Sequence, residues 1–303
     1  MRAVILTALL ATGVAQTPSA PQPTGPPATD IYLFELTGGL TSLKDAKPVP
    51  ISTAPGYDNQ PMFSADGRRI LFAANRDGKQ IDVFVFERDG GRVTQLTKTM
   101  ENENSPTYLP AGVGAPGGFS VVRTEADRTQ RLWRFDARGE NPQVVLTDVK
   151  PVGYHAWVDA DTVALFVLGQ PATLQIATIA TAKTDIVAEG IGRSLHHVPG
   201  LRAVSFVQRE ASGDFWIKLI EIGSQAIQPL VKSVEGSTDR DMTWMADGRT
   251  MLMSAGTKVF SWTRGATGWT EVFDAAARGL GTASRLAVSP KGDAIAIVVS
   301  EPR

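Results

Sequence analysis

Three histidines have the broadest chemical repertoire in this sequence, because imidazole titrates near neutral pH and binds metal ions. None of them stands at a metal-ligand spacing from another His, Asp or Glu. His196 and His197 are adjacent in an expected strand, so their side chains point to opposite faces and do not easily chelate one ion. His155 and His196 occupy comparable places in two successive repeats of the chain. They are either a functional pair across neighbouring units or structural and solvated side chains.

Other catalytic signatures are absent from the sequence. It contains no Gly-x-Ser-x-Gly nucleophile elbow, no P-loop and no dinucleotide fingerprint. The fragment Asp239-Arg240-Asp241 matches part of a calcium loop, but the remaining ligands of such a loop are missing. The glycine-rich run at 112–118 has no helix after it to cradle a phosphate, so we interpret it as a loop. The sequence therefore predicts no bound metal and no cofactor.

The elements that must position any site are repeated strands. The segment at 30–39 (DIYLFELTGG) is rewritten at 82–91 (DVFVFERDGG), with half of the positions identical and no gap. Such self-similarity marks a repeat architecture, in which one unit cannot bury its apolar face alone. The clearest copy, at 61–97, alternates strand-length apolar runs with turns at Asp66-Gly67 and Asp77-Gly78. This copy predicts four strands.

Six anchor positions divide the chain into similar units. The equivalents of Phe63 are Tyr108, Trp157, Val198, Trp244 and Val288, at spacings of 45, 49, 41, 46 and 44 residues. This period, with four strands in each unit, is typical of a β-propeller. The sixth unit stops after the strand at 294–299, and the segments at 30–36 and 49–52 supply the two missing strands. We therefore predict an all-β, six-bladed β-propeller with four antiparallel strands per blade, its ring closed by an N-terminal strand that completes the C-terminal blade.

Polar residues precede each anchor, where the chain joins the innermost strand near the mouth of the expected central channel. The segments are Asp58-Asn59-Gln60, Glu103-Asn104-Ser105, Tyr154-His155, Arg193-Ser194, Asp239-Arg240-Asp241 and Ser284-Arg285. A ring of polar groups of both charges at one channel mouth is what a binding site in this fold needs, although ordinary solvated connections between blades are the alternative. We predict a binding rim of Asp58, Asn59, Glu103, Asn104, Tyr154, His155, His196, Arg240, Asp241, Ser284 and Arg285.

The repeat resembles that of the bacterial TolB-like β-propeller family. An aromatic residue is followed by Ser/Met-x-Asp-Gly-Arg, an apolar strand, Arg-Asp-Gly, an Asp-aromatic strand and a Leu-Thr ending, most clearly at 57–97. The resemblance implies a fold more than a function, because similar blades occur in translocation scaffolds, peptidase accessory domains and polysaccharide lyases. TolB carries an α/β domain ahead of its propeller. Only the proline-dominated residues 17–29 separate the expected leader from the first strand, so we expect no such domain here.

The N-terminus has the three regions of a secretory leader. Met1-Arg2 is the charged start, 3–11 the apolar stretch and Gly13-Val14-Ala15 a small-residue cleavage signal, with a frayed strand as the alternative. The apolar stretch is too short to span a bilayer, and the chain has no cysteine for a lipid anchor or a disulfide. We expect a soluble periplasmic protein with a signal peptide at 1–15 (cleaved after Ala15 or, alternatively, Ala20), a Pro-rich tether at 16–29 and the propeller at 30–303.

The charge balance limits the partners. The chain has 30 Lys and Arg against 31 Asp and Glu, so its net charge of −1 provides no field that attracts nucleic acid or anionic lipid. We predict a non-catalytic scaffold of the cell envelope that binds a protein or peptide through the rim, with no nucleic acid and no transmembrane span. The first alternative is a carbohydrate- or peptide-cleaving lyase or hydrolase that uses His155 and His196 with Asp241 or Arg285. The second is a purely structural module paired with a separate partner domain encoded elsewhere. No prediction of the ligand's identity or of the oligomeric state follows.

Overall fold

The computed structural model describes residues 26–52 and 54–301. The expected signal peptide at 1–15 and the expected tether up to residue 25 lie outside the described residues. The described part of the chain consists of strands and turns with two short 3-10 helices, η1 (Leu40–Ser42) and η2 (Ala275–Arg278). The prediction of an all-β protein is confirmed. Neither described helix is long and apolar enough to cross a membrane.

Four sheets contain four antiparallel strands each, in which neighbours along the chain pair with one another. The strands are β7 (Asn102–Tyr108), β8 (Phe119–Thr124), β9 (Gln130–Phe135) and β10 (Gln143–Val144); β11 (Val152–Trp157), β12 (Thr162–Val167), β13 (Thr173–Thr178) and β14 (Lys183–Glu189); β15 (Ile191–His197), β16 (Ala203–Arg209), β17 (Phe215–Glu221) and β18 (Ile227–Lys232); and β19 (Met242–Trp244), β20 (Thr250–Ala255), β21 (Lys258–Thr263) and β22 (Thr270–Asp274). The second strand of each sheet contains the largest number of buried residues.

A fifth, eight-stranded sheet joins the two ends of the chain. Its strands are β23 (Ala283–Val288), β24 (Ala294–Ser300), β1 (Thr29–Glu35), β2 (Pro48–Pro50), β3 (Tyr57–Phe63), β4 (Arg69–Asn75), β5 (Asp82–Glu87) and β6 (Arg92–Gln95). The N-terminal strand β1 pairs antiparallel with β24 over seven residue pairs, from Thr29 opposite Ser300 to Glu35 opposite Ala294. A single parallel pair, Thr29 with Tyr57, links β1 to β3 and makes this sheet mixed.

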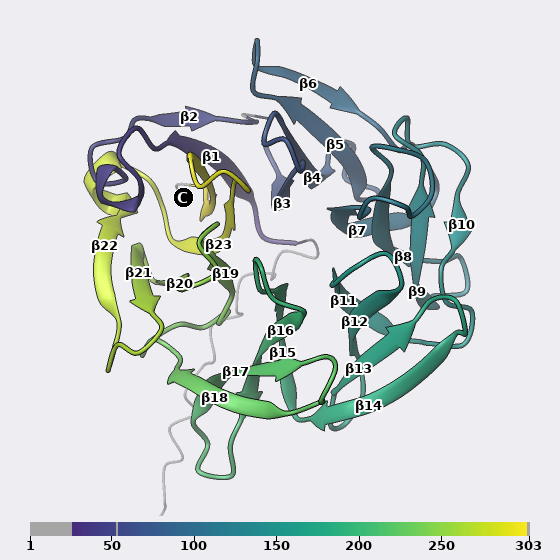
Figure 1. Ribbon diagram of the computed structural model, residues 1–303. Coiled ribbons are helices and arrows are strands. Elements are labelled where there is room, and N and C mark those ends of the chain that lie inside the picture. The colour runs from purple at the N-terminus through teal and green to yellow at the C-terminus, as the bar shows by residue number, and fades with distance from the viewer. Residues whose placement is uncertain (1–25, 53, 302–303) are drawn as a thin grey trace, which may run out of the picture.

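The sheets are arranged around a common middle (Figure 1). The strands β3, β7, β11, β15, β19 and β23 lie toward the middle, and the strands β6, β10, β14, β18 and β22 lie at the periphery (Figure 1). Each inner strand contacts the next one along the chain, and β23 contacts β3. The six anchor positions end these inner strands, since five are the last residue of a strand and Val198 directly follows β15.

Two hydrogen bonds between neighbouring sheets repeat the same design. The Trp157 indole at the end of β11 donates to the Ser120 hydroxyl of β8 at 2.9 Å. The Trp244 indole at the end of β19 donates to the Ser205 hydroxyl of β16 at 2.8 Å. All four side chains are buried, and a buried indole N–H needs such a partner. Where the anchor is tryptophan, a serine on the second strand of the preceding sheet therefore accepts the hydrogen bond of the indole N–H.

Candidate functional site

Four of the predicted rim residues lie together where the inner strands converge. Arg285 of β23 places Nε 3.6 Å from Oδ2 of Asp241, which directly precedes β19. His196 of β15 places Nε2 3.9 Å from Oδ1 of the same carboxylate. The Arg285 guanidinium also lies 5.4 Å from the centre of the Tyr154 ring of β11. Residues from four different sheets thus meet around one buried carboxylate.

The electrostatics of this group keep its ion pair charged. The Asp241 side chain is only 5% exposed, and burial, the largest single influence, opposes its ionisation. Arg285, His196 and Arg193 together outweigh burial, so the pKa of Asp241 is lowered. Burial likewise opposes the charge of Arg285, but Asp241 and the nearby tyrosines hold the pKa of the guanidinium above its usual value. The result is a fixed dipole in a weakly hydrated place, suited to polar recognition.

Two further side chains belong to this group. Burial raises the pKa of Tyr57, the first residue of β3, to about 12, and its hydroxyl interacts electrostatically with Arg285, Tyr154 and Arg193. Arg193 of β15 forms an ion pair with Asp239. Arg193 stood in one of the polar segments of the sequence, but Tyr57 was missed, although it directly precedes one of them. We call Tyr57, Tyr154, Arg193, His196, Asp241 and Arg285 the central cluster.

Two predicted acidic rim residues are instead wholly buried. Asp58 pairs with Arg76 at 2.5 Å, and the Arg76 guanidinium lies 5.1 Å from the centre of the Phe84 ring. Glu103, at the equivalent place in the next repeat, lies 3.3 Å from Nε of Arg123, a residue that in turn stacks against an aromatic ring. Neither carboxylate has exposed surface. Each forms an ion pair with an arginine of the neighbouring strand or directly after it, and so links the inner strand of its sheet to the second strand.

Burial affects the titration of these two carboxyl groups in the same direction. It raises the pKa of Asp58 despite the pairing with Arg76, and it raises the pKa of Glu103 to about 7 despite the hydrogen bond with Thr99. The Thr99 hydroxyl donates to Oε1 of Glu103 at 2.5 Å. Glu103 is therefore an internal group that changes its charge near neutral pH.

His155 points away from the central cluster. Its Nε2 lies 2.7 Å from the hydroxyl of Ser120, the same serine that receives Trp157. Burial lowers the pKa of His155 to about 3, so the ring is neutral at physiological pH. No ion pair or hydrogen bond of the described residues joins His155 to His196, and the histidine pair considered from the sequence does not form.

The remaining predicted rim residues make local contacts. The Arg240 guanidinium stacks over the Phe215 ring, 3.6 Å from its centre. The Asn59 amide donates to Thr29 of β1 at 3.4 Å, and Asn104 is half-buried. The Ser284 hydroxyl is buried without a hydrogen-bond partner among the described residues. Within residues 26–52 and 54–301, no group of three or more His, Cys, Asp or Glu has a geometry that could hold a metal ion.

Solved structures share this architecture. A putative TolB from Agrobacterium tumefaciens matches with a TM-score of 0.72 and 15% sequence identity, over 92% of this chain and 100% of that one. TolB from Acinetobacter baumannii matches with a TM-score of 0.60 and 10% identity, over 90% of this chain, which spans 64% of that protein. An oligogalacturonate lyase solved in complex with manganese matches with a TM-score of 0.55 and 11% identity, over 84% of this chain and 80% of the lyase. No protein-family model and no curated protein sequence matches the chain. On the strength of the structural likeness, the chain has the TolB-like propeller fold.

Proposed function

We propose that this protein is an exported, non-catalytic propeller scaffold that binds a protein or peptide of the cell envelope through the central cluster. The observation that carries the proposal is the Asp241–Arg285 ion pair, held at 5% and 15% exposure between the rings and cations of neighbouring inner strands. Charged groups fixed by a rigid framework supply directional contacts to a partner at little further entropic cost. The TolB-like fold supports the choice of an envelope scaffold.

The proposal includes six blades in a closed ring. The inner strands contact one another in the order β3, β7, β11, β15, β19, β23 and back to β3, which supports a ring of six units. The seven-residue pairing of β1 with β24 supports completion of the last blade by the N-terminal strands. Closure of this kind removes two sheet edges that would otherwise remain unpaired.

Export to the periplasm is part of the same proposal. It rests on the charged start, apolar stretch and small-residue signal within 1–15, and on the Pro-rich character of 16–29. Mass spectrometry of the natively exported chain tests it, with Gln16 or Pro21 as the expected first residue. A mature protein that retains Met1 would contradict export by cleavage.

The binding proposal is tested with a variant that removes the buried pair as a unit. Removing Arg285 alone would leave the Asp241 carboxylate buried and uncompensated, which destabilises the fold itself. The double variant Asp241→Asn/Arg285→Ala avoids this, and Asp159→Asn/Arg202→Ala, which removes an exposed ion pair of the same type, is the matched control. Partners are captured from the envelope extract with the mature protein, identified, and titrated against all three proteins.

We expect the cluster variant to lose about 1–3 kcal/mol of binding free energy and the control variant to bind as the parent does. Equal affinity of all three proteins for the captured partner would refute the role of the central cluster.

A carbohydrate- or peptide-cleaving activity is the second candidate. It is favoured by the likeness to oligogalacturonate lyase and by the exposed part of His196 beside Asp241, the arrangement of a base and its orienting carboxylate. Incubating the protein with acidic oligosaccharides and with peptides, and comparing it with His196→Ala, decides this. Turnover that disappears in the variant would replace the scaffold proposal with the enzymatic one.

A further inference from the structure

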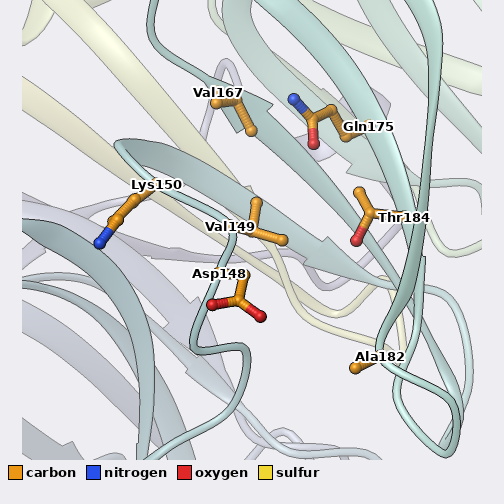
Figure 2. Close-up of a pocket in the computed structure, with 7 residues that line it drawn as sticks. All are labelled: Asp148, Val149, Lys150, Val167, Gln175, Ala182 and Thr184. Carbon is orange, nitrogen blue, oxygen red and sulfur yellow. The ribbon is translucent and has the colours of Figure 1, made fainter.

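A cavity of about 300 Å³ lies between the β10–β11 connection and the outer strands of the next sheet (Figure 2). It is separate from the central cluster, with which it shares no residue. Its lining residues are Asp148, Val149, Lys150, Val167, Gln175, Ala182 and Thr184. A volume of this size is at the lower end of small-molecule sites and fits a group no larger than a side chain.

The cavity exists because the outer strand of the preceding sheet is short. β10 contains two residues, whereas β14 contains seven. Ala177 is opposite Thr184 and Gln175 is opposite Ile186, so these four side chains share the face that looks toward the preceding sheet. Only the inner part of this face is covered, and Ile186 is 60% exposed. The connection that carries Val149 covers the rest incompletely.

Polar oxygens without partners line this cavity. The Thr184 hydroxyl is buried and has no hydrogen-bond partner among the described residues. The Gln175 amide nitrogen donates to Thr173 at 3.1 Å, which leaves its carbonyl oxygen as an acceptor. No hydrogen bond or ion pair within residues 26–52 and 54–301 involves the Asp148 carboxylate. Its nearby cation is Arg131, which donates to the Thr147 carbonyl at 3.4 Å and whose pKa is raised by Glu125 and, to a smaller extent, by Asp148. In Figure 2 the Thr184 hydroxyl is turned toward Val149, and the Lys150 ammonium extends to the opposite side.

We propose that this cavity binds a primary ammonium group carried on a short aliphatic stem. An ammonium group has three N–H donors and no acceptor, which complements the oxygens of Asp148, Gln175 and Thr184. The Asp148 carboxylate balances its charge, and the Val149, Val167 and Ala182 side chains line the same cavity with apolar surface for the stem. An orphaned buried hydroxyl gains the partner that its burial requires. The ammonium belongs either to a free diamine or to a lysine side chain of another protein.

Titrations of the full-length protein with n-butylamine, 1,5-diaminopentane and Nα-acetyl-lysine amide, monitored by NMR or calorimetry, test this proposal. n-Butanol and butyrate are the uncharged and anionic controls. We expect saturable binding of the amines only, with amide signals of 147–150 and 183–185 shifting. The tighter binder of the diamine and the lysine derivative identifies the source of the ammonium group.

Three variants complete the test. Asp148→Asn should weaken amine binding about tenfold or more, and Thr184→Val, which keeps the shape of the side chain, about three- to tenfold. Asp185→Asn, an exposed neighbour paired with Lys183, should bind as the parent does. The Asp148 substitution lies in a connection outside the strands, so it remains informative if the threonine variant folds poorly. Absence of saturable binding to the parent, or equal binding by the parent and Asp148→Asn, would overturn the proposal.

Discussion

At the scale of single residues, Ser120 shows how one hydroxyl holds two sheets together. It accepts a hydrogen bond from Trp157 and lies within hydrogen-bond distance of His155, so its removal leaves two buried ring nitrogens without a partner. Ser205 accepts a hydrogen bond from one ring among the described residues, that of Trp244, and donates to the His196 carbonyl at 3.3 Å. We expect Ser120→Ala to lower the free energy of unfolding by about 2–4 kcal/mol and Ser205→Ala by about 1–2 kcal/mol. Denaturant titrations measure both, and equal or reversed losses would show that the second ring nitrogen contributes nothing.

Glu103 should make the stability of the protein depend on pH. Its pKa in the folded state is raised from 4.5 to about 7, so the folded protein binds this proton more tightly than the unfolded chain does. The resulting stabilisation is complete below pH 4.5 and is lost as the pH rises through 7, a change of about 3 kcal/mol. We expect Glu103→Gln to be more stable than the parent at pH 8 and to lack this part of the pH dependence.

The exposed Glu140→Gln is the control for that measurement. Unfolding free energies of all three proteins between pH 4.5 and 8 give the differences directly. A parent and a Glu103→Gln variant with parallel pH profiles would contradict the raised pKa.

The directions of the rim side chains could not be predicted from the sequence. Alternation along a regular strand predicts which face each side chain takes, but five of the six inner strands have an irregular register at the predicted rim, as between Asn59 and Met62 or between Ala283 and Arg285. A bulge inserts one residue and reverses the alternation beyond it. Gln60 and Ser105, both with positive φ, lie at two of these bulges. A glycine at these positions would have indicated a bulge from the sequence, but neither residue is a glycine. The amino-acid composition therefore predicted where the polar segments lie. Which of their side chains contact one another depends on the bulges.

At the scale of elements, β1 is part of the core. Phe34 is fully buried and packs edge-on against Phe273 with 5.1 Å between ring centres. We expect Phe34→Ala to lower the free energy of unfolding by about 3–5 kcal/mol, because it removes a large buried side chain that β1 places against the β19–β22 sheet. Val49→Ala, at a 43% exposed site of β2, should cost less than about 0.5 kcal/mol. A similarly small loss for Phe34→Ala would mean that β1 is a loosely attached strand.

The strands themselves were largely predictable, because their signals are local. The six anchors all fall at the ends of inner strands, and the Asp66-Gly67 turn forms as its chemistry indicates, with Asp66 bonded to Ser64 and to the amide of Arg68. The length of the outer strands was harder to predict from the sequence. β10 is reduced to two residues where Pro142 has no N–H to donate and Asn141 adopts a positive φ of 54°. The cavity beside it depends on that shortened strand and on a long-range neighbour, which no local pattern reveals.

At the scale of the whole molecule, the two ends of the described chain meet. The amide of Glu301 donates to the carbonyl of Ala28 at 3.2 Å, one step beyond the pairing of Thr29 with Ser300. If β23, β24, β1 and β2 form one blade, moving the chain ends to another place in the ring changes the connectivity of this blade but not the pairing of its strands. Ends that are close together permit a circular permutation.

A permuted chain tests the closed ring directly. A short glycine linker from Glu301 to Ala28 and new ends between Glu235 and Gly236, both exposed, make the closing blade continuous in sequence. We expect this permutant to unfold in one cooperative transition with a midpoint near that of the parent, measured by circular dichroism and tryptophan fluorescence. Deletion of 30–56 removes the same strands instead of reconnecting them, exposes the paired edge of β24 and the apolar face of β1's partners, and should abolish cooperative unfolding. A deletion variant that melts like the parent, or a permutant that unfolds in two separate transitions, would show that the ring does not depend on closure by β1. Each blade is stabilised by its two neighbours, so a ring that needs β1 must lose the support of both neighbours of the closing blade when β1 is removed.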